Sequence, residues 1–234
     1  MLRKMRSSPK SKTDLNLRDL EELRGLLNFQ TMQEIVDHFL NSPYKSNALP
    51  KEANISESII FSLCEFDCLT FVETCLAIYL SNEADEFISK LKEIRYKEKV
   101  SFKDRNHYFS DWLNNNDKKR FIKLHKDGCT LLHKALNILK EFPSKNSIIY
   151  AHKISSEFFS KLKSESYIIA FVSDKIGLDF FHVGILIKED QIAEGLSTLY
   201  HASRSKALVV KEDIYSFIKK NNVKYVCIAK ISPV

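Results

Sequence analysis

Glycine and proline are scarce in this chain of 234 residues, which contains five of each. A loop-rich or disordered chain usually has many more of both. Hydrophobic residues instead make up 44% of the sequence and include 16 phenylalanines. The length is enough for one large domain or two small ones. We therefore expect a packed globular protein.

Long apolar runs are also missing. No stretch reaches the roughly 18 apolar residues that a membrane-spanning helix needs, so we expect no transmembrane segment. Residues 1–14 are basic and polar and have no apolar segment, which is not the pattern of a secretory signal. We expect a mobile tail over 1–14 and a single domain over 15–234. The oligomeric state is left open.

Metal-binding patterns are absent as well. The five cysteines are odd in number and none has zinc-finger spacing, which argues against a disulfide framework and a zinc site. None of the seven histidines forms a His-x-x-x-His or His-Glu-x-x-His pair. We expect no metal and no cofactor. The net charge of +6 favours anionic partners but does not indicate nucleic-acid binding.

The hydrophobic pattern changes its period along the chain. Helical spacing predicts two helices over 15–40, broken near Asn28, and further helices over 68–80, 84–96, 131–139 and 153–163. Residues 45–63 are expected to form a loop with a short strand at 58–63, and 121–124 another strand. From 167 onward, strand-like runs cover 168–172, 181–188, 196–202, 208–210 and 225–231, with a helix over 212–220. The pattern predicts an α+β fold, with helices to about 165 followed by a mostly antiparallel sheet.

The most informative stretch is Glu65–Leu80, an almost wholly apolar helix that begins at a cysteine. Asp67 is a good N-cap, so Cys68 takes the first helical position. Free backbone amides and the helix dipole favour a thiolate there, and the amides can hold an oxyanion. The alternative is a small buried cysteine on a core helix.

Two histidines lie on neighbouring predicted strands. His182 begins a buried strand, in which Gly184 permits close approach of neighbouring backbone. His201 lies near the end of the next strand, so antiparallel pairing can bring the two rings side by side. Cys68 as nucleophile, His182 as base and His201 as the group that orients the base form a thiol-catalysis arrangement. The alternative is that each histidine is a satisfied structural residue.

Residues 104–112 concentrate aromatic and polar side chains. Arg105, His107 and Asp111 lie there with three aromatics, among them the only tryptophan of the chain. The segment forms either one wall of a polar pocket, in which Arg105, His107 and Asp111 would bind substrate, or the start of an amphipathic helix whose aromatics belong to the core.

Four segments together resemble a known family. Phe66–Glu73, with Cys68 at the helix start, is similar to the nucleophile segment of the N-acetylmuramoyl-L-alanine amidase-like family, in the NlpC-type branch of papain-like cell-wall hydrolases. The other segments are Arg105–Trp112, Gly177–Gly184 and His201–Ser203, in the family's order. Ser42-Pro43-Tyr44 resembles a further family segment, in which the tyrosine lies beside the nucleophile.

The resemblance implies a papain-like core and hydrolysis, without metal, of the amide between N-acetylmuramic acid and L-alanine in peptidoglycan fragments. It implies an acyl-enzyme formed on Cys68, with His182 and His201 as its catalytic partners. Tyr44 and Asp67 are then expected to contact substrate, although Asp67 could equally serve only as the helix cap. A periplasmic or secreted location would follow, with the cytoplasm as the alternative.

Two departures from the family pattern bear on substrate choice. Leu69 stands where the family usually has a small hydroxyl residue, and Lys45-Ser46-Asn47 replaces a glycine-rich turn. Two other functions therefore stay open. One is an endopeptidase that cuts the stem peptide with the same site, and the other is a catalytically silent wall-binding or effector module.

Overall fold

The computed structural model describes residues 17–50, 57–137, 141–155, 157–163, 165–188 and 197–232. These group into two compact units, which we describe one at a time. Unit 1 consists of Met1–Arg105 and Ala202–Val210, and unit 2 of Asn106–His201 and Lys211–Val234. The expected tail over 1–14 lies outside the described residues. That 15–234 form a single domain stays a prediction.

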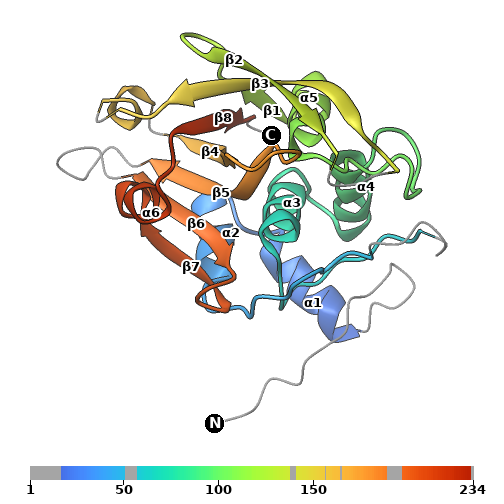
Figure 1. Ribbon diagram of the computed structural model, residues 1–234. Coiled ribbons are helices and arrows are strands. Elements are labelled where there is room, and N and C mark those ends of the chain that lie inside the picture. The colour runs from blue at the N-terminus through green and yellow to red at the C-terminus, as the bar shows by residue number, and fades with distance from the viewer. Residues whose placement is uncertain are drawn as a thin grey trace. The chain divides into compact units, whose positions relative to one another are not determined.

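Unit 1 is built on four helices, α1 (Leu17–Leu26), α2 (Met32–His38), α3 (Cys68–Tyr79) and α4 (Ala84–Arg95) (Figure 1). All four were expected, including the break between α1 and α2 near Asn28. A reciprocal capping box of Thr31 and Glu34 begins α2 and satisfies free amides of its first turn. The structure forms no strand over the described residues 57–63, so the short strand expected at 58–63 is wrong.

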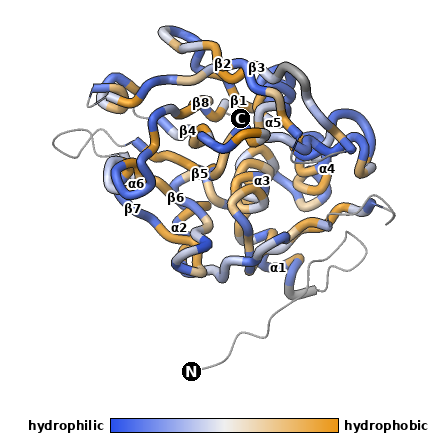
Figure 2. The backbone as a smooth tube through the Cα atoms, in the orientation of Figure 1, coloured by the Kyte–Doolittle hydropathy of each residue, from blue (hydrophilic) through white to orange (hydrophobic). Residues whose placement is uncertain are grey.

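Helix α3 is the centre of unit 1. It packs against α2 and α4 and is apolar along most of its length (Figure 2). Its one charge, Glu73, is buried and accepts a hydrogen bond from Nε of Arg95 on α4 at 2.7 Å. The same guanidinium donates to the carbonyl of Ile60 at 2.6 Å. A buried charge is tolerated only with such partners. The Glu73–Arg95 pair therefore holds α3 against α4 and against the loop that contains Ile60.

Unit 2 is built on an eight-stranded sheet of order β2-β3-β8-β4-β5-β6-β7, with β1 also paired to β8. The pairings β1–β8, β2–β3, β3–β8, β4–β8, β4–β5 and β5–β6 are all antiparallel. The segment 202–210, which ends β6 and begins β7, groups with unit 1. The strands are β1 (Ile122–Leu124), β2 (Thr130–Leu136), β3 (Ser144–Lys153), β4 (Ser166–Val172), β5 (Phe180–Lys188), β6 (Ser197–Ser203), β7 (Leu208–Asp213) and β8 (Tyr225–Ile231).

Two helices accompany this sheet. Helix α5 (Phe109–Lys118) contacts β1 and β3, and α6 (Ile214–Asn221) buries Ile214, Phe217 and Ile218. These three join a hydrophobic core with side chains of β4, β5, β6 and β8. Helix α6 begins at Asp213, whose carboxylate accepts from the amide of Ser216 at 2.8 Å. The expected α+β class with an antiparallel sheet is confirmed.

Two expected helices are wrong. Residues 130–136 form strand β2, in a hairpin with β3, instead of a helix over 131–139. Residues up to Lys153 belong to β3, and the described residues of the expected helix over 153–163 form only a single 3-10 turn, Phe159–Lys161. The sheet therefore begins near residue 122 and not near 166. The apolar residues of β2 misled the prediction because β2 is an edge strand, where Leu131 is 51% exposed.

Candidate active site

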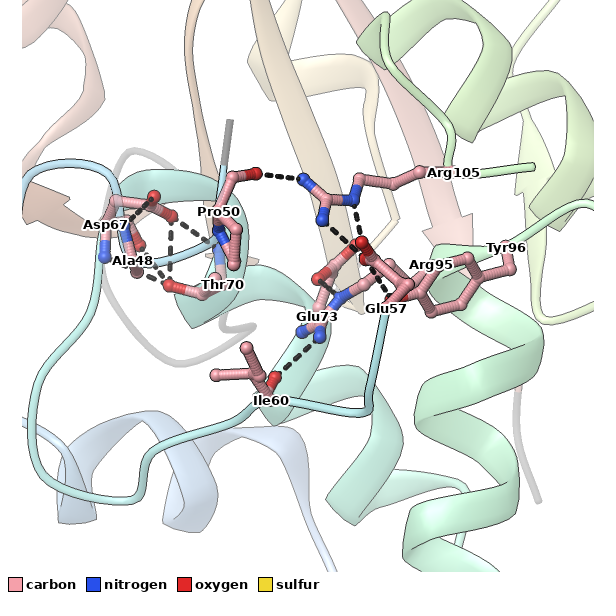
Figure 3. Close-up of polar contacts among 10 residues, drawn as sticks. All are labelled: Ala48, Pro50, Glu57, Ile60, Asp67, Thr70, Glu73, Arg95, Tyr96 and Arg105. Carbon is pink, nitrogen blue, oxygen red and sulfur yellow. Dashed lines mark hydrogen bonds and ion pairs between the residues drawn. The ribbon is translucent and has the colours of Figure 1, made fainter. Parts of the chain in front are cut away.

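In unit 1, Cys68 begins helix α3, as the sequence predicts. Asp67 is the N-cap, and its Oδ1 accepts from the amide of Thr70 at 2.8 Å. The hydroxyl of Thr70 in turn accepts from the amide of Asp67 at 3.0 Å. Oδ2 of Asp67 accepts from the amide of Ala48 at 3.3 Å (Figure 3). The carboxylate of Asp67 therefore holds the start of the helix and the preceding loop, and leaves Cys68 half-buried at the first helical position.

A short extended segment, residues 41–45, lies beside the residues that lead into α3. Tyr44 forms a parallel bridge with Phe66. The amide of Phe66 donates to the carbonyl of Pro43 at 3.0 Å, and the amide of Lys45 to the carbonyl of Phe66 at 2.8 Å. Burial raises the pKa of the Tyr44 phenol, and negative charge on Cys68 and Asp67 raises it further. Unit 1 therefore brings together three predicted site residues, Tyr44, Asp67 and Cys68.

Arg105 has a different setting in the same unit. Its guanidinium pairs with the carboxylate of Glu57 through Nε at 3.0 Å and through Nη2, and donates from Nη1 to the carbonyl of Pro50 at 2.7 Å (Figure 3). Tyr96 also donates to Glu57, at 2.6 Å. Because these contacts occupy three of its nitrogens, Arg105 anchors residues on both sides of 51–56. Its predicted contact with substrate stays a prediction.

Unit 2 joins the two predicted histidines in a line of hydrogen bonds. Nε2 of His182, on β5, lies 2.7 Å from Nδ1 of His201, on β6. Nε2 of His201 lies 2.7 Å from Oε1 of Glu212, on β7. A carboxylate only accepts, so with both rings neutral His201 donates from Nε2 and accepts at Nδ1. His182 then donates from Nε2, which leaves its Nδ1 with the lone pair of a base.

The His182 ring is held between aromatic side chains. It stacks on Phe217 of α6, with centroids 5.5 Å apart, and on Phe171 of β4 at 6.1 Å. Phe217 also meets His201 edge-on at 5.2 Å. Burial, and secondarily the neighbouring His201, lowers the pKa of His182 from its usual 6.5 to about 3. His182 is therefore neutral at physiological pH.

Gly184 lets the two strands approach at this point, as the sequence predicts. A Cβ on Gly184 would lie 2.7 Å from the carbonyl oxygen of Tyr200 and 3.2 Å from Cβ of His201. Real Cβ atoms do not tolerate the first of these distances to a backbone atom. The absence of a side chain at Gly184 thus sets the spacing of β5 and β6 beside His201.

The other predicted residues of unit 2 lie near helix α5. His107 stacks on Phe142 with centroids 4.3 Å apart, and Asp111 lies in the first turn of α5, where its charge suits the helix dipole. The buried carboxylate of Asp179 accepts from the amide of Ser110 at 2.7 Å and so caps α5. Burial raises the pKa of Asp179, and these amide contacts oppose the rise.

The sequence reasoning missed Glu212, Phe171 and Phe217. Glu212 is one of three consecutive polar residues, Lys211-Glu212-Asp213, which read as the start of a helix and not as the end of a strand. Phe171 and Phe217 are two of 16 phenylalanines and have no local mark. Only the pairing of β6 with β7 and the packing of α6 give these residues their roles.

Among the described residues, no three His, Cys, Asp or Glu side chains gather as a metal ion would require, and no helix is both long and apolar enough to cross a membrane. A cavity of about 740 Å³ in unit 2 is lined by none of the predicted site residues. Its lining includes the lysines 123, 126, 161, 163 and 230.

Comparison with known proteins gives a fold and a family. The structure is similar to that of protein LPG0564 from Legionella pneumophila, of family DUF1460, with a TM-score of 0.76 and 20% identity over 93% of this chain and 96% of that one. It is also similar to an N-acetylmuramoyl-L-alanine amidase from Bacteroides uniformis, with a TM-score of 0.68 and 22% identity over 86% and 98% of the two chains. A search of curated proteins found no match.

The family assignment comes from the sequence itself. A family model described as AmiA-like, N-acetylmuramoyl-L-alanine amidase-like, matches residues 34–225. This range contains Tyr44, Cys68, His182, His201 and Glu212. The chain therefore belongs to the N-acetylmuramoyl-L-alanine amidase-like family.

Proposed function

We propose that this protein is a cysteine amidase that hydrolyses the bond between N-acetylmuramic acid and L-alanine in peptidoglycan fragments. Cys68 is the nucleophile, His182 the base and His201 the residue that orients it. The carrying observation is the line of hydrogen bonds from His182 through His201 to Glu212, because it prepares one imidazole nitrogen as a base. We also propose that the fold is the papain-like type of NlpC hydrolases.

The surroundings of Cys68 support its role as nucleophile. The thiol lies at the first position of a helix, where free amides and the dipole favour the thiolate. The Asp67 carboxylate accepts from the amide of Thr70 and so stabilises the start of the helix, and amides of a first helical turn are suitable donors to an oxyanion. Each oxyanion donor of this kind typically increases the rate by about 10²- to 10³-fold.

The reaction then proceeds in two steps. The Cys68 thiolate attacks the lactyl carbonyl carbon of the muramic acid, and the tetrahedral intermediate collapses to a thioester. His182, protonated when the thiolate forms, gives its proton to the leaving amine of L-alanine. In the second step neutral His182 takes a proton from water, the hydroxide attacks the thioester, and N-acetylmuramic acid leaves as Cys68 recovers its proton.

The substrate also bears on the cellular location. Peptidoglycan lies outside the cytoplasm, so we propose a periplasmic or secreted enzyme. The positive net charge of the chain, +6, suits an anionic wall polymer. Tyr44 and Asp67, beside Cys68, and Arg105, His107 and Asp111 are proposed as residues that contact or position the substrate.

The test is cleavage of a purified muramyl peptide, with products identified by mass spectrometry. We expect free N-acetylmuramic acid and an intact peptide that begins with L-alanine. Cys68→Ala should abolish their release. Cys64→Ala is the matched control, because Cys64 is also half-buried and lies four residues away, and it should retain activity.

Three results would contradict this proposal. A shortened stem peptide still attached to the sugar would indicate an endopeptidase with the same nucleophile. Equal activity of the wild type and Cys68→Ala would exclude thiol catalysis. Binding without any cleavage of muramyl peptides by the wild type would indicate a catalytically silent module.

A further inference from the structure

The turn between β6 and β7, residues 204–207, is fastened to the segments that surround Cys68. Ala207 accepts from the amide of Tyr44 at 2.8 Å. Two further bonds run between Ser42 and Val209 at 2.8 Å and between Asn41 and Val209 at 2.9 Å. An antiparallel bridge joins Pro43 and Leu208. All these residues belong to unit 1.

The same segment 41–45 is bonded on its other side to Phe66, two residues before the nucleophile. Isolated bridges and hydrogen bonds thus join three backbone segments of unit 1 into a narrow platform, in which 207–209, 41–45 and Phe66 lie in that order. Through this platform the turn 204–207 is hydrogen-bonded to segment 41–45, which is itself hydrogen-bonded to Phe66, two residues before α3 begins. Four consecutive exposed residues make up this turn, so it can accept a ligand without a change in the core.

Arg204 is the first residue of the turn and is exposed. Among the described residues, no carboxylate lies within ion-pair distance of its guanidinium. Its charge acts on the Tyr44 phenol and lowers the pKa of that group, against the effect of Cys68 and Asp67. Tyr44 thus lies within electrostatic reach of both the nucleophile and Arg204. A cation near the proposed nucleophile that has no carboxylate partner in the described part of the chain suits an anionic part of the substrate.

We propose that the turn 204–207 forms a carboxylate-binding subsite in which Arg204 recognises a free carboxylate of the peptide part of the substrate. This inference rests on the proposed function for the identity of the substrate. Guanidinium and carboxylate match in geometry and form two parallel charge-assisted hydrogen bonds, which lysine cannot reproduce. Arg204 is a specificity residue here and takes no part in the bond-breaking steps.

Binding to Cys68→Ala protein tests the subsite without cleavage. The probes are one muramyl peptide with a free C-terminal carboxylate and the same peptide as its C-terminal carboxamide, with affinities measured by calorimetry. We expect the acid to bind at least about tenfold more tightly than the carboxamide. Arg204→Gln on this background should remove the preference, and Arg204→Lys should restore only part of it.

Lys206→Gln is the matched control, because it removes one positive charge from the same exposed turn and should leave the preference intact. Equal affinity for the two peptides, no binding of either, or a preference that survives Arg204→Gln would overturn the subsite. If Lys206→Gln loses the preference for the acid to the same extent, the preference comes from unspecific charge attraction, and the proposed subsite is overturned. If the acid is preferred through Arg204 and the wild type still releases no sugar, the amidase chemistry fails and the subsite stands.

Discussion

At the scale of single residues, Glu212 decides how the two histidines of unit 2 share their protons. Its carboxylate lies 2.7 Å from His201, which lies 2.7 Å from His182. Negative charge at the far end of this line favours a protonated imidazole and fixes which nitrogen of each ring carries hydrogen. Glu212 is a positioning residue, since it acts on the proposed base only through His201.

Replacing Glu212 should therefore reduce kcat more than it changes KM. We expect Glu212→Ala to lower kcat for muramyl peptide by about 10- to 100-fold, because His201 loses its acceptor and the base loses its orientation. Glu212→Gln should lose less, since its amide oxygen can still accept from His201. In Glu212→Gln, the acidic limb of the pH profile of kcat/KM should move to lower pH, because the negative charge of the Glu212 carboxylate, which favours the imidazolium, is gone.

The shift of the pH profile separates this role from a structural one. Lys211→Gln changes the neighbouring residue of the same strand and should keep both kcat and the profile of the wild type. An acidic limb that stays in place in Glu212→Gln would show that the carboxylate has no influence on the imidazole pair.

The burial of His182 predicts a pH dependence of folding. Its pKa is about 3 in the folded protein against 6.5 for an ordinary histidine, so between these values the unfolded chain binds a proton that the native protein does not. The part of the free energy of unfolding that depends on His182 is therefore fully present above about pH 6.5 and decreases as the pH falls toward 3. One such proton corresponds to a slope of about 1.4 kcal/mol per pH unit.

Urea denaturation between pH 7 and pH 4 measures this slope. We expect the free energy of unfolding of the wild type to decline more steeply than that of His182→Asn, which has no imidazole to protonate at this position. The difference should approach one proton between pH 6 and pH 4. Parallel curves for the two proteins would mean that His182 takes up its proton as readily in the native protein as in the unfolded chain.

At the scale of elements, the approach of β5 to β6 depends on Gly184. A Cβ there would meet the Tyr200 carbonyl at 2.7 Å, and this atom belongs to the backbone and cannot swing away. We expect Gly184→Ala to destabilise the protein by about 1–3 kcal/mol and to lower kcat, because the strands that carry His182 and His201 must separate. Thermal unfolding and muramyl peptide cleavage measure the two effects.

Gly25 offers the matched control. It lies within helix α1, and a Cβ there would meet no atom within 4 Å. Gly25→Ala should raise stability by about 0.5–1 kcal/mol through helix propensity and leave kcat unchanged. If Gly184→Ala behaves like Gly25→Ala, the strand spacing does not depend on this glycine.

Elements that are buried along almost their whole length could be predicted from the sequence, whereas the edge strand β2 could not. Helix α3 and strands β4, β5 and β8 present nearly continuous buried residues, so their pattern directly reflects the packing. Strand β2 has one buried residue, Leu136, and its leucines and alanine matched a helical spacing only by chance. An edge strand is held by backbone hydrogen bonds to its neighbour, which leave no mark in the sequence.

At the scale of the whole molecule, some features of the candidate site follow from local sequence patterns, and others arise only from packing between elements. The position of Cys68 at the start of α3 could be predicted because its cap, Asp67, and its apolar helix are contiguous in the chain. The pairing of His182 with His201 followed from two adjacent strands. Glu212 and Phe217 lie on β7 and α6, and the packing that gives them their partners is recorded in no local pattern.

The five cysteines allow a last prediction for the molecule as a whole. Cys75 and Cys227 are buried in the cores of units 1 and 2, and burial raises the pKa of both thiols, that of Cys227 to about 12. Cys64, Cys68 and Cys129 are half-buried. Because the thiolate is the reacting species, native protein should label with iodoacetamide at no more than three positions, and protein in urea at all five.

The order of labelling is the sharper part of this test. We expect Cys68 to react first at neutral pH, since it alone of the five begins a helix, and its modification to abolish cleavage. Peptide mapping after short exposures gives the order, and Cys68→Ala should label at one position fewer. Early labelling of Cys64 or Cys129, with Cys68 slow and activity retained, would remove the basis for Cys68 as the nucleophile. Early labelling of Cys75 or Cys227 in native protein would instead show that the two cores open readily.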